Sequence, residues 1–132
     1  MKRKLPAALN CHIAIYQYVG YAITMNIIKI LQIISNETRL DILQWLGNPA
    51  LYFKELARSV GEEAINEMGV CVGALQKKSG LSQSTISQYM ALMESVELVI
   101  SKRQGKWTYY SRNEKVLTEF QQLFISYLAN NQ

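Results

Sequence analysis

The chain has 132 residues, of which 49% are hydrophobic, and a formal net charge of +4 at pH 7. A chain of this length can bury a core of its own, so we expect neither a metal nor a disulfide to hold it together. Polar residues interrupt every apolar run well before the roughly 20 residues that a bilayer-spanning helix needs, which predicts no membrane segment. Cys11 and Cys71 provide no disulfide framework, which favours a reducing compartment, by default the cytoplasm.

The first 24 residues open with basic residues and continue with an apolar stretch that has no clear helical or strand period. They superficially match a secretory signal peptide, but polar residues break the apolar stretch and no convincing cleavage site follows it. Met25 stands directly before a well-patterned helix. Residues 1–24 are therefore expected to be either a loosely held, disordered arm or an extension before a native start at Met25, and residues 25–132 to form the domain.

The sequence predicts two helices directly after this arm. The first starts at Asn26, and Ser35-Asn36 then offers a break and a cap. The second runs from Glu37 to Leu46 and ends at Gly47-Asn48-Pro49, because proline cannot donate an amide proton. In the first helix the apolar face is formed by Ile27, Ile30, Leu31 and Ile34. In the second helix the residues expected to face inward are Leu40, Ile42, Leu43 and Leu46.

A third helical stretch is predicted from Leu51 to Met68, with Gly61 as an interruption. Its apolar face comprises Leu51, Leu56, Val60, Ala64 and Ile65.

A helix-turn-helix pattern follows. Val70, Ala74 and Leu75 predict a first helix that ends at Ser79-Gly80, and Leu81 is expected to tuck between the two helices. Ser82 is a natural N-cap for a second helix to about Ser95. In that helix the predicted buried stripe is Ile86, Met90 and Met93, and the opposite face is Gln83, Ser84, Ser87, Gln88 and Ala91.

A β-hairpin is predicted next. Leu98–Arg103 and Trp107–Arg112 alternate in polarity around Gln104-Gly105-Lys106, a short glycine-containing loop. Trp107 and Tyr109 share one face and are expected to pack on the domain. Lys102, Arg103 and Lys106 have no apolar role and are expected to reach a phosphate backbone or a minor groove.

This order of elements is a winged helix-turn-helix, a mainly α fold with a small β-hairpin, and it predicts binding to double-stranded DNA. Six basic and two acidic residues lie between Leu75 and Arg112, whereas the preceding part of the chain is nearly neutral. Glutamine can pair with adenine, and serine or threonine with a base edge or a phosphate. The alternative is an ordinary solvated helix surface. The predicted DNA-binding residues are Gln83, Ser84, Thr85, Ser87, Gln88, Tyr89, Lys102, Arg103 and Lys106.

Three segments resemble the ArsR-type winged-helix repressors, named for the arsenical-resistance regulator. They are residues 35–43 (SNETRLDIL), residues 80–88 (GLSQSTISQ) and residues 105–110 (GKWTYY). The resemblance implies a homodimer that binds a palindromic operator near its own promoter, blocks transcription, and dissociates when an effector binds. The competing interpretation from the residues is a winged-helix module for a protein or RNA partner, since fold does not fix function.

The last predicted helix carries a wide apolar stripe, more than a helix at the margin of so small a core needs. Together with the isoleucine-rich first helix, it suggests a second buried surface of the kind that homodimers use. The alternative is that it only closes the monomer core. The residues predicted at a dimer interface are Ile27, Leu31, Phe120, Leu123, Phe124 and Tyr127.

The effector is not evident from the sequence. Metal-sensing proteins that this chain resembles often carry two cysteines separated by one residue before the recognition helix, whereas this chain has Cys71 and Gly73. The remaining soft ligands are Cys11 and His12, so we expect neither a metal site nor a cofactor. Cys71 is either a redox or effector site or a buried structural cysteine.

The chain also departs from the family it resembles in Pro49–Met68, which is longer than the usual link and which we call the insert. The insert could bind a small molecule, enlarge a dimer interface or contact DNA, and its composition favours none of these. An enzyme is not expected, because no phosphate-binding glycine loop, paired carboxylates or nucleophile and base set can be assembled.

Overall fold

The computed structural model describes residues 26–129, and the predicted arm of residues 1–24, with Cys11 and His12, lies outside them. The described chain is mainly helical with a three-stranded antiparallel sheet, which confirms the predicted fold class. None of the described helices is long and apolar enough to cross a bilayer. After a helical segment at residues 26–34, the elements are α2 (Glu37–Gly47), α3 (Pro49–Tyr52), α4 (Lys54–Val60), α5 (Glu62–Met68), β1 (Val70–Cys71), α6 (Val72–Ser79), α7 (Gln83–Ser95), β2 (Val99–Gln104), β3 (Trp107–Arg112) and α8 (Glu114–Ala129).

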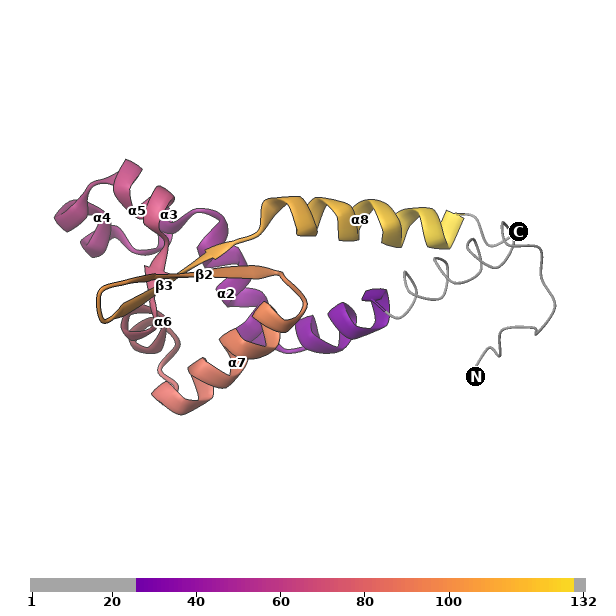
Figure 1. Cartoon of the computed structure of the whole chain (residues 1–132), viewed down its shortest axis with the longest axis horizontal. Helices are drawn as coiled ribbons and strands as arrows, with labels where there is room; N and C mark the ends of the chain where they lie inside the picture. Colours follow the sequence, from indigo (N-terminus) through magenta and orange to yellow (C-terminus); the bar gives the residue numbers. More distant parts are fainter. Residues whose placement is uncertain (1–25, 130–132) are drawn as a thin grey trace.

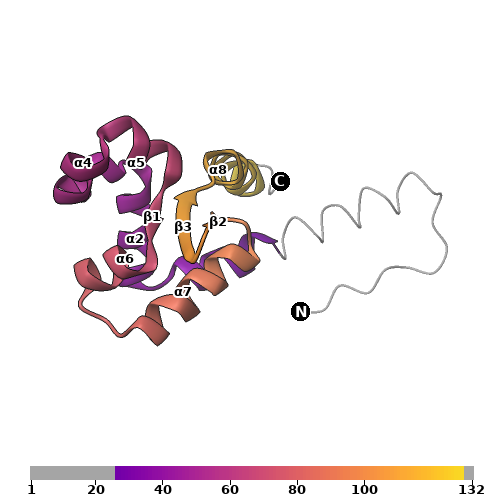
Figure 2. The same ribbon diagram turned by 60° about the vertical axis from the view of Figure 1, so that its left-hand side comes forward.

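The sheet lies between α7 and α8. Figure 1 shows α7 on one side of the β2–β3 hairpin and α8 on the other, and Figure 2 shows the same order after rotation. The helices of the insert, α3 to α5, lie at one end of the molecule, while α8 extends away from the sheet in the opposite direction. Helix α7, predicted to read DNA, and helix α8, predicted to form a dimer, therefore lie on different sides of the hairpin.

The segment at residues 26–34 buries only part of its predicted apolar face. Ile27, Ile30 and Ile33 are buried, whereas Leu31 is exposed and Ile34 only half-buried. Ile27 is predicted at a dimer interface, but in the single chain it is only 5% exposed. Leu31 remains available for such an interface.

Helix α2 is capped as its sequence suggests, since the Asn36 side chain accepts a hydrogen bond from the Arg39 amide at 3.0 Å. Ile42, Leu43 and Leu46 are buried, as predicted. The prediction for Leu40 was wrong, because its side chain is 50% exposed. Leu40 lines a shallow hollow between α2 and α8 instead of the core.

The insert is three short helices and not one. Pro49 begins α3, and Gly61, with φ of 96°, separates α4 from α5, which confirms the predicted interruption. Because the helical phase restarts twice, the single apolar face predicted for this stretch was wrong at Leu51 and Val60, which are exposed. The residues that anchor the insert in the core are Phe53, Ala57 and Ile65.

Strand β1 was not predicted. Val70, assigned to a helix from its sequence, instead pairs with Tyr110, and Cys71 pairs with Tyr109. This pairing requires glycine at position 69, where φ is 90° and a Cβ atom would overlap the Tyr110 carbonyl group. The chain leaves α5 through this glycine and joins the hairpin as a third strand.

The helix-turn-helix follows its predicted course. Gly80 ends α6 in the left-handed conformation, with φ of 72°, and its amide donates to the Gln76 carbonyl. The Ser82 hydroxyl accepts from the Thr85 amide at 3.2 Å, which confirms the predicted N-cap of α7. The residues of this region that are fully buried are Leu75, Ile86, Met90, Met93 and Leu98, with Val99 at 1% exposure.

Two glycines near β1 provide a matched test of this packing. We expect Gly69→Ala to lower the free energy of unfolding by at least about 2 kcal/mol, because the new methyl group would combine backbone strain with overlap. Gly73→Ala, on α6 with nothing within 4 Å of the added Cβ, should change stability by no more than about 1 kcal/mol, in the favourable direction. Urea unfolding followed by circular dichroism at equal protein concentrations measures both. Equal stability of the two variants would contradict the close approach at Gly69.

Candidate nucleic-acid interface

One face of α7 is exposed, polar and uncharged. Gln83, Ser84, Ser87 and Gln88 are all exposed on it, as predicted from the helical period. The face is exposed because Ile86, Met90 and Met93 are fully buried on the opposite side and fix the rotation of the helix. Side-chain amides and hydroxyl groups in this arrangement can donate to and accept from base edges in a major groove.

The first turn of α7 carries a cluster of hydroxyl groups. The Ser82 hydroxyl lies 2.8 Å from the Thr85 hydroxyl and 3.1 Å from the Ser84 hydroxyl, within hydrogen-bond distance of both. Thr85 is half-buried, whereas Ser84 is exposed. Ser84 and Thr85 were both predicted to bind DNA, but they differ in exposure. Thr85 serves the cap, whereas Ser84 also faces solvent.

Tyr89 is engaged within the chain. The Arg39 guanidinium lies over its ring at 4.7 Å from the centroid, and the Arg39 Nε donates to the Ile33 carbonyl at 2.5 Å. Tyr89 is accordingly half-buried. Its ring therefore contacts α2 through Arg39, and Arg39 in turn bonds to the end of the helical segment at residues 26–34. The position of Tyr89 in the sequence did not suggest this contact.

The β2–β3 hairpin is the wing of this fold, and its base is attached to α7. The Ser101 hydroxyl donates to the Glu94 carboxylate, so β2 is held against the last turn of that helix. Burial raises the pKa of the half-buried Tyr110 phenol above its usual value, and the nearby Glu94 carboxylate raises it further. The Ser101–Glu94 hydrogen bond therefore fixes the base of the wing relative to α7.

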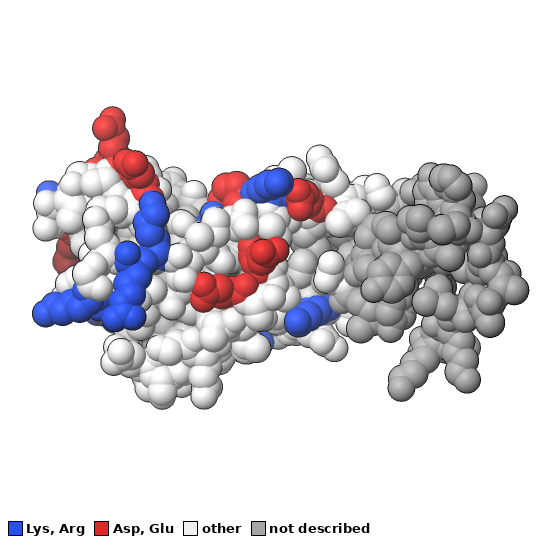
Figure 3. Space-filling model, viewed as in Figure 1, with Lys and Arg blue, Asp and Glu red and all other residues white. Residues whose placement is uncertain are grey.

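The outer half of the wing is basic. Lys102, Arg103 and Lys106 are exposed there, as predicted. Within residues 26–129 the carboxylates that lie within 4.0 Å of a cation pair with Lys77 or Arg112, and none pairs with these three. Figure 3 shows Lys and Arg side chains gathered at the end of the visible face, where Figure 1 places the hairpin tip. Such unpaired cations suit phosphate groups.

Trp107 corrects one prediction. It was expected to pack on the domain, but it is 55% exposed, and the Lys106 ammonium lies 5.4 Å from its ring centroid. Trp107 pairs with Gln104 at the end of the ladder, next to the Gly105-Lys106 turn. Its position directly after the loop indicates a residue at the exposed tip, whereas the alternating pattern alone predicted that it faces inward. Trp107 therefore joins the candidate interface as an exposed aromatic residue at the wing tip.

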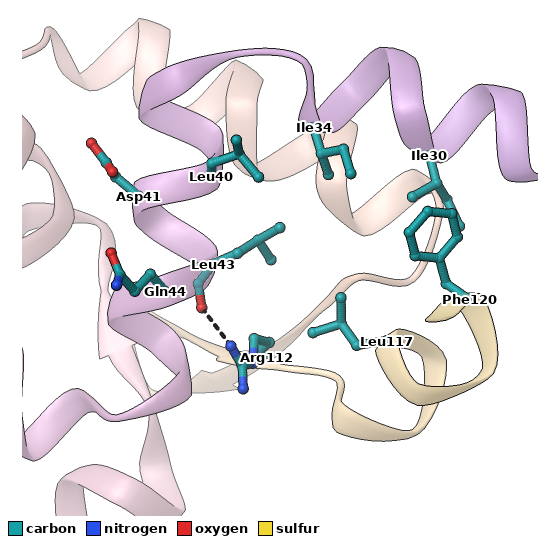
Figure 4. Close-up of a pocket in the computed structure, with 9 residues that line it drawn as sticks. All are labelled: Ile30, Ile34, Leu40, Asp41, Leu43, Gln44, Arg112, Leu117 and Phe120. Carbon is teal, nitrogen blue, oxygen red and sulfur yellow. Dashed lines mark hydrogen bonds between the residues drawn. The ribbon is translucent and has the colours of Figure 1, made fainter. Parts of the chain in front are cut away.

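Arg112 adds to the basic charge of the wing by sequence, but its guanidinium is engaged. It donates to both carboxylate oxygens of Glu114, at 2.6 and 3.0 Å, and to the Leu43 carbonyl at 3.2 Å. Figure 4 shows it between α2 and the start of α8, at the edge of a hollow of about 430 Å³ that Leu40 and Phe120 also line. Arg112 thus connects β3, α2 and α8 and does not face DNA as a free cation.

Cys71 lies at the N-cap of α6 and is half-buried, so it is neither fully buried nor freely exposed. Gly73, at the position of the second cysteine in metal-sensing proteins of the kind described above, is exposed on the same helix. Among the described residues there is no group of three or more His, Cys, Asp or Glu side chains that could hold a metal ion. The role of Cys71 stays a prediction.

The comparisons with known proteins agree with this architecture. No family model matches the chain. The uncharacterized HTH-type transcriptional regulator YbzH of Bacillus subtilis is 40% identical over 93 residues, which cover 70% of this chain and 89% of YbzH. The putative arsenical resistance operon repressor ArsR2 of Halobacterium salinarum is 35% identical over 77 residues, which cover 58% of this chain and 60% of ArsR2.

Among solved structures, the fold is similar to that of Mb0332 from Mycobacterium bovis, with a TM-score of 0.58 and 18% identity over 96% of this chain and 94% of that one. Mb0332 is described as a homodimeric winged helix-turn-helix DNA-binding domain and a possible ArsR-family transcriptional regulator. At this identity the likeness concerns the fold alone. The sequence relatives show that the chain belongs to the ArsR family of helix-turn-helix, DNA-binding transcriptional regulators, and its fold is the winged form of that motif.

Proposed function

We propose that the protein is a homodimeric repressor that binds a palindromic operator and dissociates from it when an effector binds. One observation carries the proposal: an uncharged polar face of α7 and the unpaired cations of the wing are exposed on a single rigid unit. This combination separates base reading from phosphate binding, as sequence-specific DNA recognition requires.

In the proposed complex the first turns of α7 enter the major groove. Gln83 and Gln88 are the residues best suited to read adenine, because a carboxamide can pair with its N6 and N7 atoms. Ser84 and Ser87 are expected to contact base edges or phosphates. The wing cations Lys102, Arg103 and Lys106 are expected to bind the backbone or the minor groove beside it.

The far half of α8 supports a homodimer. Val116, Leu117 and Phe120 pack against the core, but the apolar stripe continues beyond them, and no residue of α8 is fully buried. Leu123 and Tyr127 are each 37% exposed, and Phe124 stacks on Phe120 at 5.8 Å between ring centroids. A second copy would cover this stripe and Leu31. The homodimeric state of Mb0332 is consistent with such an assembly.

A two-fold axis would place two copies of α7 in successive major grooves on one side of the duplex, which is why we propose a palindromic operator. Bound near a promoter, the dimer would exclude the transcription machinery. Effector binding would then need to favour a dimer conformation in which the two helices no longer match the groove spacing.

The major-groove assignment is tested by Gln83→Ala and Gln88→Ala. Removal of each amide should cost about 1–3 kcal/mol of preference for the native duplex, because its paired hydrogen bonds to a base can no longer form. The measurement is fluorescence anisotropy with duplex from the upstream region of the protein's own gene and a scrambled competitor. Gln44→Ala, an exposed amide on α2, serves as the control. If the wild-type protein binds both duplexes equally and weakly, the partner is not this operator, and a protein or RNA partner becomes the better interpretation.

The wing is tested by the charge-removing variants Lys102→Gln, Arg103→Gln and Lys106→Gln. They should weaken binding to all duplexes alike, and the slope of log K against log salt should fall by about 0.9 for each phosphate that the variant no longer neutralises. The matched control is Lys115→Gln, an exposed lysine in the first turn of α8. Retention of the full slope in the triple variant would exclude the wing as a phosphate-binding element.

The dimer surface is tested by two substitutions two residues apart. Leu123→Asp introduces a charge into the apolar stripe and should convert the dimer to a monomer, because an unpaired carboxylate would be buried there. Ile125→Asp places the same charge on the opposite face of α8, where Ile125 is 58% exposed, and should leave the dimer intact. Sedimentation equilibrium measures both. A dimer that persists in Leu123→Asp, or one that dissociates equally in both variants, would show that this stripe is not the interface.

A further inference from the structure

A hollow of about 770 Å³ separates the insert from the first helix of the helix-turn-helix. This volume is within the range of small-molecule sites in proteins. Helices α3 and α4 supply one wall, and the last turns of α6 supply the other. The side chains that matter here are Leu51, Tyr52, Leu56, Lys54, Lys77 and Lys78.

The hollow is positively charged. Lys54, Lys77 and Lys78 line it, against one carboxylate, that of Glu55. Glu55 lies 3.9 Å from the Lys77 ammonium, and both side chains are at least 85% exposed, so solvent screens this pair and a competing anion can displace it. Within the described part of the chain no carboxylate lies within 4.0 Å of Lys54 or Lys78.

The Lys78 ammonium is held in place by uncharged groups. It donates to the Tyr52 carbonyl at 3.1 Å, and it lies 5.2 Å, 5.7 Å and 5.5 Å from the ring centroids of Trp45, Tyr52 and Phe53. The rings attract the cation but carry no net charge, and two of its three N–H groups remain free to donate to a ligand. The chain thus positions a cation at the hollow without neutralising it.

The wall formed by α3 and α4 also carries apolar side chains that are incompletely covered. Leu51, which its sequence placed in the core, is 52% exposed, and Leu56 and Tyr52 are half-buried beside it. A ligand with an apolar body would remove this surface from water. We propose that the hollow between the insert and α6 binds a small organic anion with an aromatic or aliphatic body, its acidic group facing Lys54, Lys77 and Lys78.

Such a ligand is in a position to act as the effector, a role that rests on the proposed repressor function. Lys77 and Lys78 belong to the last turn of α6, and Ser79, Gly80 and Leu81 connect that turn directly to α7. A ligand that bridges the insert and α6 would favour one placement of α6 relative to the core. Operator affinity depends on the same placement, so the two binding events are expected to be coupled, typically by about 5–150-fold.

The first experiment is an NMR titration of the ¹⁵N-labelled full chain with three carboxylates: 2-naphthoate, 4-phenylbutyrate and decanoate. The proposal predicts that at least one binds with a Kd below about 1 mM, and that the amide shifts concentrate in α3, α4 and α6. The neutral carboxamide of that ligand should bind at least tenfold more weakly. Shifts centred on α8 or scattered over the surface, equal binding of acid and amide, or no binding by all three acids would each overturn it.

Matched variants locate the charge. Lys54→Gln with Lys77→Gln should weaken binding of the carboxylate at least tenfold, and both lysines are exposed, so the fold should persist. Lys115→Gln on α8 should leave it unchanged. Leu51→Ser tests the apolar wall separately and should weaken the acid and its amide alike. Unchanged affinity in the double lysine variant would overturn the anion site.

Operator binding distinguishes this proposal from the one it rests on. With saturating carboxylate, wild-type affinity for the operator should change at least fivefold, and the double lysine variant should bind the operator normally but not respond. An unchanged operator affinity would overturn the effector role. If the lysine variant binds DNA poorly without ligand and carboxylates do not bind, these lysines contact phosphates and the pocket proposal fails alone. If wild-type protein shows no operator preference, the proposed repressor function fails, whatever the titration shows.

Discussion

Burial of one side of α7 is the constraint on which the DNA-facing surface depends. Ile86, Met90 and Met93 have no exposed surface, so the helix cannot rotate without placing polar groups in the core. Its glutamines and serines are thereby held outward. The wing is then fixed to the same helix through Ser101 and Glu94. Because the polar face of α7 and the basic wing are held in one rigid unit, they can contact a major groove and its phosphates at the same time.

The second organising feature is the addition of β1 to the hairpin. Gly69 permits a backbone approach to Tyr110 that any side chain would block, and the pairing at Val70 follows from it. This strand immediately precedes α6, so the insert is attached at the sheet on one side and to α2 on the other. The insert is not a loose loop, because Phe53, Ala57 and Ile65 pack it against the core. Helices α3 and α4 of the insert face α6 across the lysine-lined hollow.

Local signals made most of this fold predictable. The cap at Ser82, the left-handed Gly80 and the period of three buried residues specify α7 from short-range sequence alone. The predictions that were wrong concern residues whose secondary structure or burial depends on contacts with distant parts of the chain. The strand at Val70 depends on Tyr110, forty residues later, and the exposure of Leu40 and Trp107 depends on which elements fail to cover them. A count of basic residues likewise included two cations that have partners within the chain. Arg112 bonds to Glu114 and to the Leu43 carbonyl. Lys78 bonds to the Tyr52 carbonyl and lies among aromatic rings.

The two tryptophans of the chain occupy separate surfaces, and this gives the molecule two built-in optical reporters. Trp107 is at the wing tip in contact with solvent, whereas Trp45 is half-buried, edge-on to Phe53 and beneath the Lys78 ammonium. Their emission maxima should differ, because indole fluorescence shifts to longer wavelength in water. A chain retaining only Trp107 would report events at the hairpin, and one retaining only Trp45 would report events where the insert meets α6. Spectroscopy on unlabelled protein can therefore follow these two surfaces separately in time.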